Sequence, residues 1–183
     1  MAKIILGITG EIACGKGTIT SHLAKEYKAG THRFSTMLRD VLDRMYIEQS
    51  RDNLALISKI LRQNFGEDVM AKTMMKEAES DEHEIVIIDG VRRLADIKYL
   101  RELPHFKLLY VEADIQKRYE RIIKRGENTD DSGKTFEEFQ KEQTLESETQ
   151  IRDLKNYANY VVDNNGTYTD LYEQIDKIIK ENN

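Results

Sequence analysis

The stretch Gly10-Glu-Ile-Ala-Cys-Gly-Lys-Gly-Thr18 places four residues between its first two glycines and a lysine directly after the second. Residues with small or no side chains let backbone N–H groups curl closely around the phosphates of a nucleotide. In such a loop Lys16 extends a cation to the β- and γ-phosphates, Gly17 opens the following helix, and Thr18 is placed to ligate Mg²⁺. The stretch therefore predicts a phosphate-binding loop.

The segments on either side of the loop support this interpretation. Residues 3–8 are apolar and predict a buried strand, and residues 18–27 place Ile19, Leu23 and Tyr27 on one face of a helix. The motif requires a strand, a loop and a helix in this order. A glycine-rich turn with a chance lysine is the alternative, and the flanking elements count against it.

Length and composition narrow the class of protein. We expect a single domain over residues 1–183, with a substantial core. The net charge of −5 argues against nucleic acid or an anionic membrane surface as the main partner. The single cysteine, Cys14, excludes an internal disulfide and disfavours a structural zinc site. The sequence lacks an apolar run that could span a bilayer and a signal-peptide pattern, so we expect a cytoplasmic protein, as a monomer or homodimer.

Further apolar runs predict an α/β fold. Strands are expected at residues 31–35, 84–89, 106–111 and 160–162, and helices at 36–45, 51–65, 67–79, 95–103, 114–125, 136–157 and 170–180, with 136–157 as one or two helices. Alternating strands and helices imply a mostly parallel five-stranded sheet with helices on both faces and ligands at the carboxyl ends of the strands. The helices of residues 36–80 form an insertion.

Charged residues follow the strand predicted at residues 84–89. Asp89 ends this strand, where a carboxylate can hold Mg²⁺ directly or through water. A strand-end aspartate that caps the next turn is the alternative. Arg92 and Arg93 follow, and two guanidinium groups beside an acidic strand end suit the capture of a second phosphate.

The helix predicted at residues 114–125 carries Arg118, Arg121 and Arg125 on one side. Because a polar, glycine-containing loop follows at residues 126–134, this arrangement suits a lid, within residues 118–148, that closes over ATP and excludes water. A solvated basic face is the alternative, with Glu120 and Glu127 as partners.

Several of these segments resemble the adenylate kinase and wider nucleoside monophosphate kinase family. Besides the Gly-Lys-Gly-Thr ending of the loop, residues 87–93, Ile-Ile-Asp-Gly-Val-Arg-Arg, look like the Asp-Gly-Phe-Pro-Arg segment of that family. The resemblance implies that Asp89 lies beside magnesium and that Arg93 binds the acceptor phosphate. Met37-Leu-Arg39 is similar to the end of the acceptor segment, and Arg121 and Arg125, followed by Asp130-Asp131, resemble the start of the lid.

Other segments are closer to dephospho-coenzyme A kinases. Thr9-Gly-Glu-Ile12 is similar to their Thr-Gly-Gly-Ile opening, and residues 158–167, ending Asp-Asn-Asn-Gly-Thr, resemble their last strand and adenine loop. Their Asp-Ala-Asp acceptor segment has no counterpart in this sequence. Thr129 replaces an expected lid arginine, and residues 136–148 offer Lys141 and Glu142 in place of another. Kinase-like proteins of archaea and bacteria with an Asp-Gly-Ile-Arg segment look nearest.

Together, the residues and the resemblance predict a three-layer P-loop kinase fold that uses ATP and Mg²⁺ to phosphorylate a nucleotide-like small molecule, above all a (deoxy)nucleoside monophosphate. A dephospho-coenzyme A kinase, in which Asp89 would be the candidate base, and a regulatory P-loop NTPase are the alternatives. The predicted catalytic residues are Lys16, Arg93, Arg121 and Arg125. The predicted ATP-binding residues are Gly10, Glu11, Ile12, Ala13, Cys14, Gly15, Lys16, Gly17, Thr18, Arg121, Asn165 and Gly166. Arg39, Arg92 and Arg93 are predicted to bind the acceptor, and Thr18 and Asp89 the metal.

Overall fold

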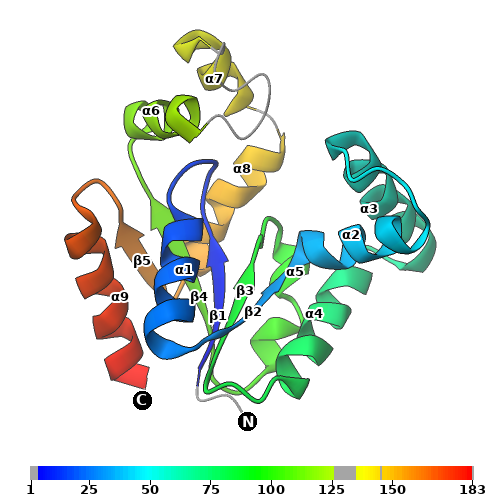
Figure 1. Ribbon diagram of the computed structural model, residues 1–183, viewed down its shortest axis with the longest axis horizontal. Coiled ribbons are helices and arrows are strands. Elements are labelled where there is room, and N and C mark those ends of the chain that lie inside the picture. The colour runs from blue at the N-terminus through cyan, green and yellow to red at the C-terminus, as the bar shows by residue number, and fades with distance from the viewer. Residues whose placement is uncertain (1–3, 126–134, 145, 183) are drawn as a thin grey trace.

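Five parallel strands form the centre of the computed structural model, which describes residues 4–125, 135–144 and 146–182 (Figure 1). The strand order is β2-β3-β1-β4-β5. The strands are β1 (Ile4–Thr9), β2 (Gly30–Arg33), β3 (Ile85–Asp89), β4 (Phe106–Glu112) and β5 (Tyr160–Asp163). All five predicted strands are therefore present, with bounds that differ by one or two residues.

Helices occupy most of the segments between the strands. They are α1 (Lys16–Tyr27), α2 (Phe34–Arg44), α3 (Arg51–Phe65), α4 (Val69–Ser80), α5 (Leu94–Ile97), α6 (Ile115–Arg125), α7 (Phe136–Glu142), α8 (Glu146–Asp153) and α9 (Tyr168–Asn182), with 3-10 turns at Leu100–Glu102 and Leu154–Tyr157. No helix in the described part of the chain is long and apolar enough to cross a membrane.

The sheet has helices on both faces because its central strands are apolar on both sides. Successive residues of a strand point to opposite faces. Ile4, Leu6 and Ile8 of β1 pack in a core with α1 and α9, whereas Ile5 belongs to a second core with α2, α4 and α5. This three-layer arrangement confirms the predicted fold class and brings the end of β1 to the start of α1.

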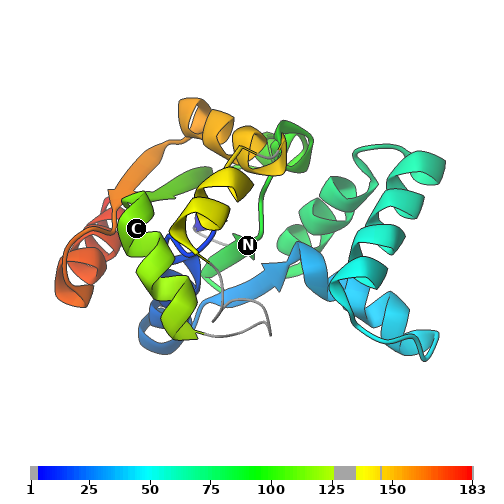
Figure 2. The ribbon, with the colours of Figure 1, turned by 90° about the horizontal axis from the view of Figure 1, so that it is seen from above.

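Two groups of helices stand at the carboxyl edge of the sheet. Figures 1 and 2 show α2 and α3 on one side of the molecule and α6 and α7 on the other. Between these groups lie the loop after β1 and the end of β3, which carry the predicted phosphate-binding and metal-binding residues. The predicted lid loop, residues 126–134, lies outside the described residues.

Several helix bounds differ from the sequence prediction, most of all after β3. The predicted helix at residues 95–103 is only the short α5 followed by a 3-10 turn that ends before Pro104. Leu100 and Leu103 are buried, so the chain tightens here to place both side chains in the core. Residues 136–157 contain two helices, α7 and α8, which is one of the two predicted arrangements, followed by a 3-10 turn, whereas α1 begins at Lys16, two residues before its predicted start.

Candidate phosphate-binding site

The loop between β1 and α1 requires its first two glycines. Gly10 and Gly15 have φ angles of 143° and 110°, in a region that residues with side chains rarely adopt. A Cβ on Gly10 would collide with the carbonyl oxygen of Val111, and one on Gly15 would collide with the Asn164 side chain. In contrast, a Cβ on Gly17 would meet open space. The backbone and its neighbours thus fix the two glycines that the motif predicted.

Lys16 lies across the loop that precedes it. Its Nζ donates to the carbonyl oxygens of Gly10 at 2.6 Å and Glu11 at 3.1 Å, and lies 3.6 Å from the Sγ of the buried Cys14. The ammonium group is therefore held within the curl of the loop, next to the backbone that would surround phosphate groups. The binding of phosphate by Lys16 stays a prediction.

The loop after β5 fastens the phosphate loop from the other side. Buried Asn164 donates from Nδ2 to the carbonyl of Cys14 at 2.7 Å. Arg121 of α6 donates to the carbonyl of Asn164 at 2.7 Å and to that of Cys14 at 3.4 Å. The structure therefore brings Arg121 to the phosphate loop, as expected of an ATP-side residue. Asn164 was not among the predicted site residues, although it lies within the stretch that resembles the adenine loop.

The predicted adenine-loop residues lie beside the start of α6. The Asn165 side chain accepts a hydrogen bond from the backbone N–H of Asp114 at 2.8 Å, and Lys117 donates to the Asn165 carbonyl. Gly166 is exposed and adjoins Asp170, whose carboxylate accepts from the Thr167 hydroxyl at 2.8 Å. These contacts fix the loop that would border the base of a nucleotide.

Arg118 is buried, with only 3% of its surface exposed, so it belongs to no solvated face. Its guanidinium donates to the Gln143 side chain at 2.8 Å and pairs with Glu11 at 3.3 Å. Arg152 of α8 reaches the same Glu11 oxygen at 3.3 Å. Two arginines from either side of residues 126–134 thus converge on the phosphate loop. Arg152 lies four residues beyond the segment in which the resemblance predicted an arginine, and no local pattern marks it.

Tyr110 of β4 is a buried neighbour of this network. Burial raises the pKa of its phenol to about 12, and the negative charge of Glu11 adds to the effect. Tyr110 is therefore neutral at physiological pH. It can donate a hydrogen bond there but does not serve as a base.

Asp89 ends β3 on the face of the sheet that α1 covers. Ile85 and Ile87, four and two residues earlier, pack in the core that includes α1 residues, and alternation places Asp89 on the same side. Arg33 is the neighbour of Asp89 in β2, and its Nε donates to Asp89 Oδ2 at 2.8 Å, while its Nη2 forms an ion pair with the same oxygen at 2.7 Å. The sequence analysis missed Arg33 because only the strand register brings these two residues together.

Asp89 and Thr18 fit a magnesium ion that is shared with a nucleotide. Across the described residues, no three or more His, Cys, Asp and Glu side chains are arranged to hold a metal ion by themselves. Mg²⁺ is commonly bound by one or two carboxylates together with substrate phosphates and water. One carboxylate at a strand end and one hydroxyl at the start of α1 suit that kind of site.

The side chain of Asp96 holds the backbone of the loop that follows Asp89. This buried carboxylate accepts from the backbone N–H groups of Arg92 and Arg93, both at 3.0 Å, and from Arg62 Nη2 at 3.3 Å. The side chains of Arg92 and Arg93 are exposed, and Arg93 lies 3.7 Å from Glu67. The backbone of the arginine loop is therefore fixed, while its cationic side chains are accessible.

Two predicted site arginines remain, Arg39 and Arg125. Arg39 is exposed on α2 and donates to the Gln49 side chain at 2.7 Å. Gln49 belongs to the connection between α2 and α3, so this hydrogen bond stays within the same group of helices. Arg125 ends α6, and its side chain is outside the described part of the structure.

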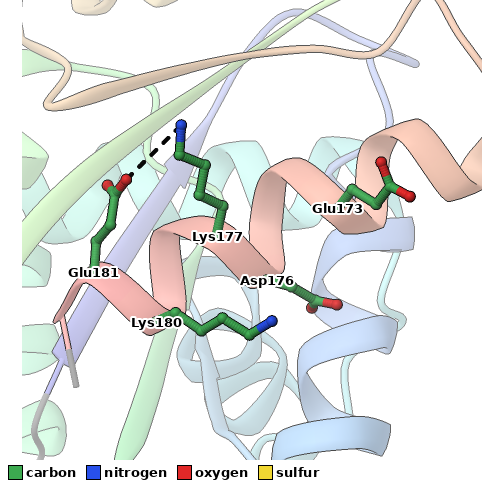
Figure 3. A pocket seen from close by; sticks show the side chains of 5 residues that line it. All are labelled: Glu173, Asp176, Lys177, Lys180 and Glu181. Carbon is green, nitrogen blue, oxygen red and sulfur yellow. Dashed lines mark ion pairs between the residues drawn. The ribbon is translucent and has the colours of Figure 1, made fainter.

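A surface hollow on α9 is separate from this site. Figure 3 shows that five charged side chains line it: Glu173, Asp176, Lys177, Lys180 and Glu181. Asp176 accepts hydrogen bonds at 2.8 Å from His22 and 2.9 Å from Tyr27, which join α9 to α1. We attribute these charges to the packing and solvation of α9.

The sheet order and the loop before α1 define a P-loop kinase fold. Two solved structures share it: the Thermus thermophilus protein TT1252, with a TM-score of 0.63 and 17% identity over 99% of this chain and 98% of that one, and shikimate kinase from Bacteroides thetaiotaomicron, with a TM-score of 0.63 and 12% identity over 97% of each. At these identities the likeness concerns the fold.

The sequence comparison shows the family. A family profile described as AAA domain (AAA_18) matches residues 6–146, most of the chain, and this protein belongs to that family. Similar proteins include two named UPF0200 protein. The one from Hyperthermus butylicus is 28% identical over 88% of this chain and 86% of its own length, and the one from Methanocaldococcus jannaschii is 27% identical over 97% and 90%.

Proposed function

We propose that this protein transfers the γ-phosphoryl group of ATP to a (deoxy)nucleoside monophosphate, with Mg²⁺. The observation that carries this proposal is the loop of residues 10–18, which requires two glycines and binds the Lys16 ammonium group at the carbonyls of Gly10 and Glu11. The exposed arginines after β3 support a second phosphate-bearing substrate. The P-loop kinase fold supports small-molecule phosphotransfer as the reaction class.

The reaction would be an in-line displacement. An acceptor phosphate oxygen forms a bond to the γ-phosphorus while the bond to the β,γ-bridging oxygen breaks, which yields ADP and a nucleoside diphosphate. Lys16 would exchange its hydrogen bonds to loop carbonyls for bonds to the β- and γ-phosphates. Arg121 would add positive charge on the ATP side, and Arg93 would orient the acceptor. Bound Mg²⁺, held by Thr18 and Asp89, supplies charge neutralisation at these phosphates. A phosphate oxygen carries no proton to remove at neutral pH, so no general base is required.

A hydroxyl acceptor is the second candidate, and the fold likeness to shikimate kinase favours it. Such an acceptor requires a base, and Asp89 is the predicted one. However, the exposed side chains of Arg92 and Arg93, in the loop directly after Asp89, suit an acceptor that carries a phosphate. For this reason we prefer a phosphate acceptor.

A coupled assay of ADP release tests these alternatives. The acceptors are all ribo- and deoxynucleoside monophosphates, dephospho-coenzyme A, shikimate, and no acceptor, each with Mg²⁺ and ATP. We expect release that depends on a nucleoside monophosphate and disappears in Lys16→Ala, which excludes a contaminating kinase. Release with only a hydroxyl acceptor would favour the second candidate. Equal release without any acceptor would indicate an NTPase.

A further inference from the structure

Arg33 and Asp89 form an ion pair at the carboxyl edge of the sheet. They are register partners in β2 and β3, and two guanidinium nitrogens converge on one carboxylate oxygen at 2.8 and 2.7 Å. The Asp89 side chain is only 9% exposed, whereas that of Arg33 is 55% exposed. The carboxylate is thus fixed in the protein, and its cationic partner can reach solvent.

This carboxylate is also the predicted magnesium ligand. A buried carboxylate without a cationic partner is strongly unfavourable, so Asp89 requires a positive charge beside it in every state. Arg33 supplies that charge in the structure. Both cations need the same carboxylate, and binding of Mg²⁺ at Asp89 would therefore weaken its hold on Arg33.

A released Arg33 would lie next to the acceptor-side arginines. Its Cγ is 4.0 Å from the position that a Cβ on Gly90 would take, and Gly90 begins the loop that carries Arg92 and Arg93. Arg33 also directly precedes α2, on which Arg39 lies. A rotation of the side chain, without movement of the sheet, would add a guanidinium to this group.

We propose that Asp89 exchanges the Arg33 guanidinium for Mg²⁺ when Mg·ATP binds, and that the released Arg33 then binds the phosphate of the acceptor. This inference rests on the proposed function and deepens it. It makes Arg33 a specificity residue for phosphate-bearing acceptors, because a guanidinium pairs well with phosphate oxygens. It also predicts that the acceptor binds more tightly after Mg·ATP than before.

The first test measures the metal requirement for nucleotide binding without any acceptor. Binding of a fluorescent ATP analogue is followed as Mg²⁺ is titrated into wild type, Arg33→Met and Arg33→Gln. Removing the competing cation should lower the half-saturating Mg²⁺ concentration roughly three- to fivefold, as expected for a partly exposed ion pair. Arg44→Met, an exposed arginine of the same helix group, is the matched control and should leave the midpoint unchanged.

An unchanged or raised midpoint in both Arg33 variants, with thermal unfolding that shows them folded, would overturn the exchange. This result would leave the proposed function intact, provided that the wild type binds Mg·ATP. Conversely, a lowered midpoint combined with no phosphoryl transfer to any acceptor would support the exchange and count against the proposed function. The two failures are thus distinguishable.

The second test measures acceptor binding by calorimetry with each of the four ribonucleoside monophosphates, with and without Mg²⁺ and a non-hydrolysable ATP analogue. We expect the analogue to tighten binding of at least one monophosphate severalfold in the wild type and in Arg44→Met, but not in Arg33→Met. Equal tightening in Arg33→Met would overturn the role of Arg33 at the acceptor. The absence of monophosphate binding by the wild type would overturn it as well.

Discussion

Arg62 of α3 and Asp96 of α5 form an ion pair at 3.3 Å, with side chains that are only 9% and 3% exposed. Asp96 also accepts from the backbone N–H groups of Arg92 and Arg93. The helical group of residues 34–80 is therefore joined to the arginine loop by a buried charge pair. A substitution at Asp96 can therefore affect both the stability of the fold and the proposed binding of the acceptor at the arginine loop.

We expect Asp96→Ala to lower the free energy of unfolding by about 3–5 kcal/mol, because it leaves the Arg62 charge buried without its partner. Urea unfolding measures this loss. Asp96→Asn, which retains a hydrogen-bond acceptor, should lose less, and Asp40→Ala on the exposed side of α2 serves as the control. A loss below about 1 kcal/mol for Asp96→Ala would show that the pair contributes little.

Lys16→Ala should lower kcat by about a hundredfold or more, because the ammonium group stabilises charge on the transferring phosphoryl group. The fold should survive, since Lys16 is the first residue of α1 and belongs to neither hydrophobic core. Steady-state kinetics and circular dichroism measure the two effects. Turnover within about threefold of the wild type would remove Lys16 from the catalytic residues.

Replacing Arg39 or Arg93 by alanine should raise KM for the acceptor much more than KM for ATP. The expected loss of acceptor binding free energy is about 1.5–3 kcal/mol for each lost charged hydrogen bond. Arg92→Ala is the informative comparison, because Arg92 lies beside Arg93 in the loop whose backbone Asp96 holds. A larger effect of Arg92→Ala would assign the acceptor phosphate to that residue. An equal rise in both KM values would place these arginines outside acceptor recognition.

Arg121→Ala should reduce kcat by more than it weakens ATP binding, because contacts that strengthen in the closed state stabilise the transition state. ATP affinity is measured by calorimetry and kcat by the coupled assay. Lys124→Ala, on the same helix and exposed, provides the control. If ATP affinity falls as much as kcat, the role of Arg121 is to hold the loop at Cys14 and Asn164.

Stability should fall in acid because of Asp81, at the start of the connection to β3. Burial opposes ionisation, but hydrogen bonds from His83 and His32 outweigh it and lower the pKa of Asp81. A lowered folded-state pKa contributes stability above the unfolded value, near pH 4, and this contribution is lost as pH falls through the folded value. Asp81→Asn should flatten the dependence of unfolding free energy on pH below about pH 4. If the slope of unfolding free energy against pH is the same in Asp81→Asn and the wild type, Asp81 is not the source of the loss of stability in acid.

The strands β1, β3 and β4 could be predicted because each is a local apolar run between polar segments. Residues 84–89 and 106–111, for example, are buried nearly throughout and correspond closely to β3 and β4. The phosphate loop was equally accessible, since its glycines and lysine lie within nine consecutive residues. Information of this kind is contained in short windows of sequence.

The partners of the charged residues could not be predicted in this way. Arg118 is buried against Glu11, more than a hundred residues earlier, and Arg33 meets Asp89 only through the pairing of β2 with β3. Helical spacing shows that Arg118 shares a side with Arg121, but it does not show what that side contacts. Such pairs depend on tertiary structure, which a local pattern does not contain.

The hydrogen bond from Asn164 to the Cys14 carbonyl spans 150 residues of sequence. It has a consequence for biosynthesis. The nucleotide-binding motif is synthesised about 150 residues before the amide that holds it, which directly follows β5. A nascent or truncated chain that ends before β5 would carry the whole motif and lack its fastening. The ability to bind nucleotide should therefore mature only when the segment after β5 docks on the loop, and it would report on that docking.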